Sequence, residues 1–184
     1  MTRSAVLLMD LQRDFLGAAG SRMPVAPESV PAVVDTANAI LSKKVLARAL
    51  PILIVNQFPA ADRIANFFRH GAAVAGTPGA GLDPRILDGG SVKVLVKASP
   101  SAFTNPELDR LLRAEEITDL YVMGVFAEGC IRSTVLDARR RGYGVHVIAN
   151  AVATNAPWKK RFALWAMKRA GADIMQSAPL QTAS

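Results

Sequence analysis

Short apolar runs alternate along the chain with stretches whose apolar residues recur at helical spacing. The runs are typical of strands buried on both faces, and they cover residues 5–9, 51–55, 92–96, 120–125, 143–148 and, more briefly, 173–175. Helices are predicted after Ser29, around residues 62–69, over 106–113, after Cys130 and through Trp158 to Trp165. The alternation predicts an α/β fold, with a parallel sheet covered by helices on both faces in one domain spanning residues 1–184.

Two stretches rich in Gly, Ala and Pro predict loops, at residues 17–28 and 59–90. The second is long and holds only the short helix around residues 62–69. Loops of this length in a compact domain are usually functional or poorly ordered. The tail after Ser177 carries no structural pattern.

Composition narrows the protein class. The chain has 184 residues, 51% of them hydrophobic, and its one cysteine excludes an intramolecular disulfide and a CxxC metal or redox motif. Asp10 interrupts the first apolar run, so we expect no signal peptide. The longest later apolar stretch, residues 45–55, contains Arg48 and Pro51 and is too short to span a bilayer. We therefore expect a cytoplasmic protein without a membrane partner.

The net charge of +7 raises the question of a nucleic-acid or acidic partner. The basic clusters at residues 139–141, 159–161 and 168–169 lie on or beside predicted helices, where such residues commonly form the solvated face. No aromatic residues interleave the first cluster, and no zinc-finger or RNP-like pattern is present, so we expect no nucleic-acid binding. An attraction to anionic small substrates stays open. The aromatic positions 158, 162 and 165 are interpreted as core packing.

The only cysteine, Cys130, lies where a predicted strand turns into a helix. A thiol at a helix N-terminus faces free backbone N–H groups and the positive end of the helix dipole, and both favour the thiolate. The same N–H groups suit an oxyanion formed during acyl transfer. Cys130 is therefore a candidate nucleophile, the alternative being a small apolar core residue.

Two charged residues occupy positions like that of Cys130. Asp10 and Lys97 each follow a predicted parallel strand, and the carboxyl ends of such strands meet in one crevice. Asp10 suits general base and acid work, while Lys97 would keep that carboxylate ionised and favour the thiolate. Asp10 could instead be a helix cap or turn residue. His70 falls in a loop and His146 within a strand, so a Cys–His arrangement finds little support.

Three segments together resemble the isochorismatase-like cysteine hydrolases, the family that includes nicotinamidase and N-carbamoylsarcosine amidohydrolase. The segments cover residues 8–15, 97–103 and 124–138. The resemblance implies a three-layer Rossmann-like fold with a six-stranded parallel sheet and a catalytic triad of Asp10, Lys97 and Cys130. It also implies a cis peptide between Val125 and Phe126, an oxyanion hole from the N–H groups of Phe126 and Cys130, and a homo-oligomer, dimer or tetramer.

The chain departs from the family pattern at several positions. Nicotinamidases of the family carry an Asp-x-His metal motif after the second strand, where this chain has Asn56-Gln57-Phe58. We therefore expect neither a metal nor another cofactor. Thr is common in the family at the positions of Ala127 and Pro106. The presence of Cys130 disfavours isochorismatases that lack this nucleophile.

These observations predict a metal-independent cysteine hydrolase that cleaves a C–N bond, in an amide, ureido or carbamoyl group of a small molecule, through a Cys130 thioester. The substrate pocket is predicted at Phe15, Asn56, Phe58 and Phe126, and for the further candidates Phe103 and Trp158 core packing is an equal alternative. Three other functions remain open: a non-catalytic small-molecule-binding or scaffold member of the fold, an isochorismatase-type vinyl ether hydrolase, and a basic nucleic-acid-binding protein.

Overall fold

A six-stranded parallel sheet in the order β3-β2-β1-β4-β5-β6 forms the centre of the molecule. The computed structural model describes residues 3–17, 20–87 and 92–179. The strands are β1 (Arg3–Met9), β2 (Leu50–Asn56), β3 (Lys93–Lys97), β4 (Ile117–Val125), β5 (Gly144–Ala153) and β6 (Asp173–Met175). The strand order reverses between β1 and β4, which are neighbours in the sheet. Open α/β sheets bind their ligands at such a reversal, beyond the carboxyl ends of the strands.

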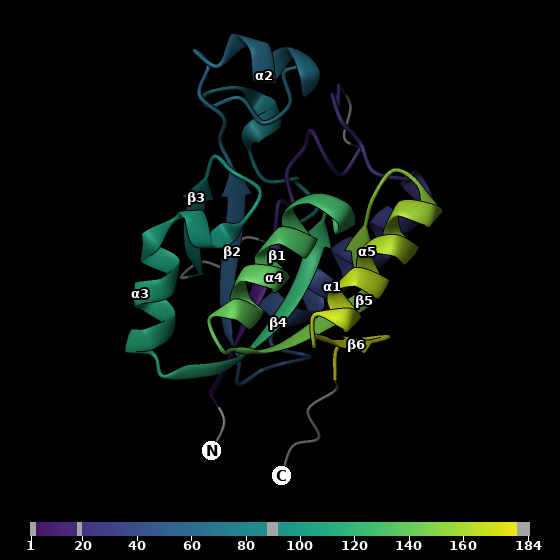
Figure 1. The fold of residues 1–184 in the computed structure, drawn as a ribbon. Coiled ribbons are helices and arrows are strands. Elements are labelled where there is room, and N and C mark those ends of the chain that lie inside the picture. The colour runs from purple at the N-terminus through teal and green to yellow at the C-terminus, as the bar shows by residue number, and fades with distance from the viewer. Residues whose placement is uncertain (1–2, 18–19, 88–91, 180–184) are drawn as a thin grey trace.

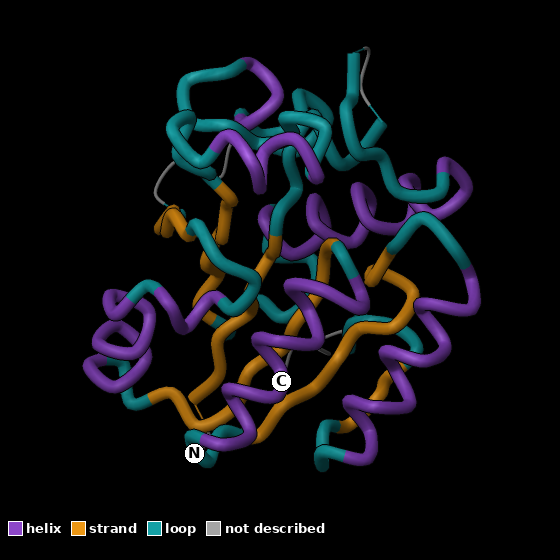
Figure 2. Tube along the Cα trace, turned by 45° about the horizontal axis from the view of Figure 1, so that its top comes forward, coloured by secondary structure: helices purple, strands orange, loops and turns teal. Residues whose placement is uncertain are grey.

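Helices cover both faces of this sheet, so the predicted three-layer α/β fold is confirmed (Figures 1 and 2). The helices are α1 (Val30–Leu41), α2 (Arg63–Phe68), α3 (Pro106–Ala114), α4 (Arg132–Arg140) and α5 (Pro157–Arg169). Helix α1 lies on one face, α3, α4 and α5 lie on the other, and α2 stands apart beyond the strand ends (Figure 1). Short helical turns occur at η1 (Pro27–Ser29), η2 (Pro78–Ala80), η3 (Ala102–Thr104) and η4 (Ala127–Ile131).

The continuous apolar run of β1 follows from burial on both faces. Val6 and Leu8 pack into the core beneath α1, whereas Leu7 and Met9 pack into the core on the opposite face. Because successive strand side chains point to opposite sides, a strand covered on both sides has no solvent-facing position in its buried part, here residues 5–9. The sheet order thus explains why the pattern of this strand does not alternate.

Gly124 allows β1 and β4 to approach closely at the reversal. Its φ is +117°, and a Cβ built there would collide with the carbonyl oxygen of Met9. The next residue after β1, Asp10, has a φ of 59°, in the left-handed region that Asp adopts more readily than most residues. The close approach therefore brings Asp10 beside the turn that follows β4.

Most predicted elements agree with the structure to within a few residues, and one interpretation was wrong. Strand β5 continues to Ala153, five residues past the predicted end at Ile148. The aromatic residues of α5 are not core: Trp158, Phe162 and Trp165 are 66%, 53% and 56% exposed. The helix instead packs on the sheet through Ala163 and Met167, which lie on another side of its axis.

The short helix predicted in the second loop is confirmed as α2, and the structure adds the turn η2. Helix α2 and turn η2 both lie in the region of residues 59–90, although residues 88–90 fall outside the described residues, as do 18–19 of the first loop and 180–184 of the tail. No helix in the described ranges has the length and apolar character needed to cross a membrane.

Candidate active site

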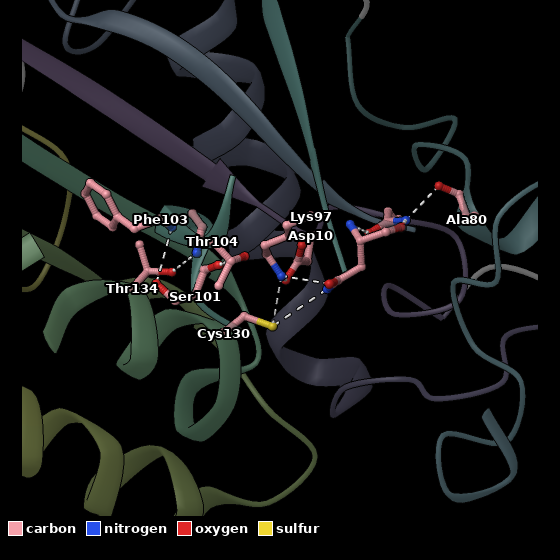
Figure 3. A network of polar contacts seen from close by, with 11 residues as sticks. Asp10, Ala80, Lys97, Ser101, Phe103, Thr104, Cys130 and Thr134 are labelled. Carbon is pink, nitrogen blue, oxygen red and sulfur yellow. Dashed lines mark hydrogen bonds and ion pairs between the residues drawn. The ribbon is translucent and has the colours of Figure 1, made fainter. Parts of the chain in front are cut away.

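Four strand ends place four polar side chains in one network beside the strand-order reversal (Figure 3). Asp10 follows β1, Asn56 ends β2, Lys97 ends β3, and Cys130 lies in the turn η4 that follows β4. The structure thus brings together the three predicted catalytic residues. It adds Asn56, which sequence analysis assigned only to the substrate pocket.

Lys97 is the centre of this network. Its Nζ donates to Oδ2 of Asp10 at 3.0 Å, to Oδ1 of Asn56 at 2.8 Å and to Sγ of Cys130 at 3.2 Å. These acceptors use all three donors of an ammonium group. The Lys97 and Asp10 side chains are essentially inaccessible to solvent, so the ion pair is a buried one whose geometry the surrounding strands fix.

Asn56 connects the thiol to the backbone of the sheet. Its Nδ2 lies 3.7 Å from Sγ of Cys130, in position to donate a hydrogen bond to sulfur. Gln12 holds the Asn56 main chain in both directions: the Asn56 N–H donates to Gln12 Oε1 and Gln12 Nε2 donates to the Asn56 carbonyl, both at 2.8 Å. Sequence analysis missed Gln12, although it lies two residues after Asp10 within the segment that carries the resemblance.

The same stretch fastens the long loop beside the site. Gln12 Nε2 also donates to the carbonyl of Ala80 at 2.6 Å, and the carboxylate of Asp14 accepts from the Ala73 N–H at 2.9 Å. Gln12 and Leu82 form an isolated antiparallel bridge. Buried polar side chains must find partners, and here the partners are main-chain groups of the loop. These hydrogen bonds therefore fix part of the 59–90 region in place next to the four polar groups.

Burial sets the ionisation of the thiol. It raises the pKa of Cys130 to about 12; the nearby negative charge of Asp10 adds to this effect, and Lys97 opposes it. Burial likewise raises the pKa of Asp10 above its ordinary value, again against the influence of Lys97. Removal from water therefore outweighs the effect of Lys97, one of the two influences that sequence analysis expected to favour the thiolate.

A proton can nevertheless move within the network without creating net charge. With Lys97 protonated, Asp10 ionised and Cys130 as a thiol, the three side chains sum to zero. Transfer of the thiol proton to Asp10 gives a thiolate and a neutral carboxyl, and the sum is still zero. Since burial penalises added charge rather than its relocation, the thiolate can form by internal transfer although it does not form by loss of a proton to solvent.

The predicted aromatic residues divide into two groups. Phe15 and Phe126 are both buried and meet edge to face, with ring centroids 5.5 Å apart, and Phe58 lies beneath the guanidinium of Arg69 at 3.9 Å. Phe103 stacks on Tyr143 in the core between the sheet and its helices, and Trp158 points to solvent. Phe15, Phe126 and Phe58 therefore stay pocket candidates. Phe103 packs in the core and Trp158 faces solvent, so neither stays a pocket candidate.

The peptide between Val125 and Phe126 is cis, as the resemblance implied. A surface hollow of about 730 Å³ lies at the amino-terminal edge of the sheet, between Arg3, Arg48 and Glu115. Its chemistry is unrelated to the four polar groups at the carboxyl edge.

The donor set beside the thiol does not fit a divalent metal. At the motif position, the amide of Asn56 is engaged by Lys97 and the thiol, and Phe58 carries the Arg69 cation over its ring. His146 lies between Asp119 at 3.2 Å and Asp173 at 3.3 Å, near the amino-terminal ends of the strands. Among the described residues, no group of three or more His, Cys, Asp and Glu is arranged to hold a metal ion.

Comparison with known proteins points to one family. A family model for the isochorismatase domain matches residues 4–179. A nicotinamidase from Escherichia coli K12 is 29% identical over 207 residues, covering 95% of each chain. A probable inactive nicotinamidase from Arabidopsis thaliana is 29% identical over 165 residues, 84% of this chain and 82% of the relative. An isochorismatase domain-containing protein 2 from Xenopus laevis is 33% identical over 100 residues, only 53% of this chain and 48% of that relative.

Solved structures show the same architecture. A pyrazinamidase from Pyrococcus horikoshii, determined in complex with zinc, superposes with a TM-score of 0.81 and 28% identity, over 95% of this chain and 99% of that one. An isochorismatase-like hydrolase from Alkaliphilus metalliredigens, 23% identical, has the same TM-score of 0.81 over 95% of this chain and 94% of its own.

Proposed function

This chain belongs to the isochorismatase domain family, and on that premise we propose that it is a metal-independent cysteine hydrolase. The reaction is cleavage of a C–N bond, in an amide, ureido or carbamoyl group of a small molecule, through a thioester on Cys130. The observation that carries the proposal is the position of Lys97 Nζ, within hydrogen-bonding distance of both the Asp10 carboxylate and the Cys130 sulfur. The similarity to a protein named nicotinamidase supports the amide class.

The first half of the reaction forms a C–S bond and breaks the C–N bond. Sγ of Cys130 attacks the carbonyl carbon as its proton passes to Asp10, and Asp10 then gives that proton to the departing amine. The oxyanion formed in between accepts hydrogen bonds from the backbone N–H groups of Phe126 and Cys130. The acyl group remains on sulfur, and Asp10 is again a carboxylate.

Water completes the cycle. Asp10 takes a proton from a water molecule, whose oxygen adds to the thioester carbonyl, and the C–S bond breaks to release the acid. The proton on Asp10 returns to the sulfur and restores the thiol. Lys97 remains protonated throughout and keeps the network neutral, while the amide of Asn56 donates to the sulfur as its charge develops.

The predicted pocket residues supply an apolar boundary for the acyl group. The rings of Phe15 and Phe126 are in edge-to-face contact. Phe58, two residues after Asn56, packs beneath the guanidinium of Arg69. Rigid rings of this kind favour a small planar substrate, because they change shape little on binding.

The test uses the single cysteine. The protein is incubated with a panel of small amides, ureido compounds and carbamoylated amines, ammonia or amine release is followed, and the intact mass is recorded after acid quenching. We expect turnover of one class and an acyl adduct on Cys130, both absent in Cys130→Ala, with Asp10→Asn slowed by at least about 100-fold. The matched control, Asp83→Asn, removes another buried carboxylate that pairs with Arg85 away from the thiol. Turnover that survives in Cys130→Ala would contradict the mechanism.

One observation favours a second function, a binding member of the family without catalysis. The high pKa of Cys130 is what an inert core thiol would show, and one relative carries the description probable inactive nicotinamidase. The same panel separates hydrolase from binding protein. A ligand of a binding protein raises the melting temperature of the protein, but it does not acylate Cys130 and is not hydrolysed.

A further inference from the structure

The outward side of α5 combines aromatic and cationic side chains that the proposed hydrolase reaction leaves without a role. Trp158, Phe162 and Trp165 recur at helical spacing and are each more than half exposed. Arg161, Lys168 and Arg169 are exposed on the same side of the helix. We call these six residues the α5 face. Helix α5 lies at the outer edge of its layer (Figure 1). Because its buried residues Ala163 and Met167 meet the sheet, the α5 face looks away from it.

The charge on this helix has one sign. The sequence of α5, PWKKRFALWAMKR, contains five cations and no carboxylate. Lys159 pairs with Glu128 at 3.5 Å at the start of the helix, while the guanidinium of Arg169 lies 5.4 Å from the Trp165 ring centroid within the face itself. The three cations of the α5 face therefore remain available to an anionic partner, in a protein whose net charge is already +7.

We propose that the α5 face binds the surface of an anionic lipid bilayer. Tryptophan rings favour the interface between lipid headgroups and acyl chains, and Arg and Lys beside them reach the anionic headgroups. The helix needs no rearrangement for this, since Ala163 and Met167 anchor its inner side to the sheet. Such peripheral contact is compatible with the lack of a membrane-crossing helix in the described ranges, and it departs from the expectation of no membrane partner, which considered only spanning segments.

A second copy of the chain fits this face less well. A symmetric contact through α5 would bring the same cations of two molecules together, and like charges across an interface oppose association. The three aromatic side chains expose roughly 350 Å² together, taking about 200 Å² for each full side chain. A stable protein interface needs about 800 Å² from each partner.

The test uses the two tryptophans of the chain, which both lie on the α5 face. The purified protein is titrated with vesicles of phosphatidylcholine and phosphatidylglycerol in equal parts, and with vesicles of phosphatidylcholine alone. We expect the tryptophan emission to shift to shorter wavelength and the protein to sediment with the anionic vesicles only, more weakly as salt is added. Brominated acyl chains in the same vesicles should quench this emission in the unmodified protein.

A pair of matched variants locates the contact. The triple change Arg161→Gln, Lys168→Gln and Arg169→Gln keeps both tryptophans and should lower vesicle partitioning roughly 100-fold, since each cation near an anionic surface contributes about fivefold. The control removes the same charge from exposed positions in the connection between α1 and β2, and should leave partitioning nearly unchanged; it consists of Lys43→Gln, Lys44→Gln and Arg48→Gln.

Three results would overturn the proposal. Equal losses of vesicle partitioning in the two triple variants would show that partitioning follows net charge and not the α5 face. Sedimentation with vesicles without a change in tryptophan emission or quenching would place the contact on another surface, such as the exposed Phe67 and Phe68 of α2. A shift of emission that needs no lipid and grows with protein concentration, together with a larger mass in analytical ultracentrifugation, would assign the face to a second copy.

Discussion

The buried thiol makes the stability of this protein depend on alkaline pH in a calculable way. Burial raises the pKa of Cys130 from 9.0 to about 12, so between these values the folded protein keeps a proton that the unfolded chain loses. The stabilisation is fully present below pH 9 and is lost as the pH rises. At pH 10 the loss is about 1.4 kcal/mol relative to neutral pH, and it approaches about 4 kcal/mol at the folded pKa.

The assay is urea denaturation of the wild type and of Cys130→Ala at pH 8 and pH 10. Other groups titrate in this range too, and those distant from Cys130 contribute equally to both proteins. The difference between the two therefore reports on the thiol together with the Asp10 and Lys97 side chains in its network. We expect the alanine variant to gain about 1.4 kcal/mol on the wild type between the two pH values. An unchanged difference would show that the folded thiol titrates like a free one. A change of opposite sign would show that the helix N-terminus and Lys97 win over burial, and would refute the reasoning.

Three further predictions concern the same region. Lys97→Met should lower the free energy of unfolding by about 3–5 kcal/mol, because the buried Asp10 carboxyl loses the cation that opposes the rise of its pKa. The loss should grow as the pH rises above the ordinary pKa of the carboxyl, since the unfolded chain then ionises Asp10 freely and the folded variant does not. Asp10→Asn in the same chain should restore part of the loss in urea denaturation, and no restoration would contradict the buried pair. Gln12→Leu should cost about 2–4 kcal/mol, because it strands main-chain groups of β2 and the loop; a loss below about 0.5 kcal/mol would mean that water replaces the side chain. Gly124→Ala should lower the melting temperature well beyond Gly142→Ala, which also has a positive φ, +87° against +117°, but open space around it. Equal effects would argue against the close approach of β1 and β4.

The convergence of Asp10, Lys97 and Cys130 could be predicted because it depends only on topology. Each follows a strand in the sequence, and parallel strands point their carboxyl ends to one edge of the sheet. The partnership of Gln12 with Asn56 could not be predicted in this way. It joins side-chain and main-chain groups 44 residues apart, and such pairing follows from the sheet order and not from any local pattern.

Burial is what the sequence does not show, both at Cys130 and in α5, where the core interpretation of the aromatic residues was wrong. The position of Cys130 at a turn into a helix is visible in the sequence, whereas the exclusion of water that raises its pKa is not. In α5, helical spacing places Trp158, Phe162 and Trp165 on one side, but Ala163 and Met167 share the same spacing on another. Periodicity defines the sides of a helix but does not say which side meets the sheet. In α5 the side that meets the sheet is that of Ala163 and Met167.

The reversal of strand order also divides the chain along its length. Asp10, Asn56 and Lys97 come from β1, β2 and β3, whereas Cys130 comes from the strand that begins the second half of the sheet. During synthesis, the ribosome therefore completes the acid–base groups before it makes the nucleophile. The pairing of β4 with β1 both joins the two halves of the sheet and brings the sulfur of Cys130 to Lys97. A protein cut between β3 and β4 would thus yield two fragments with no complete site in either, and thiol protection would report their reassembly.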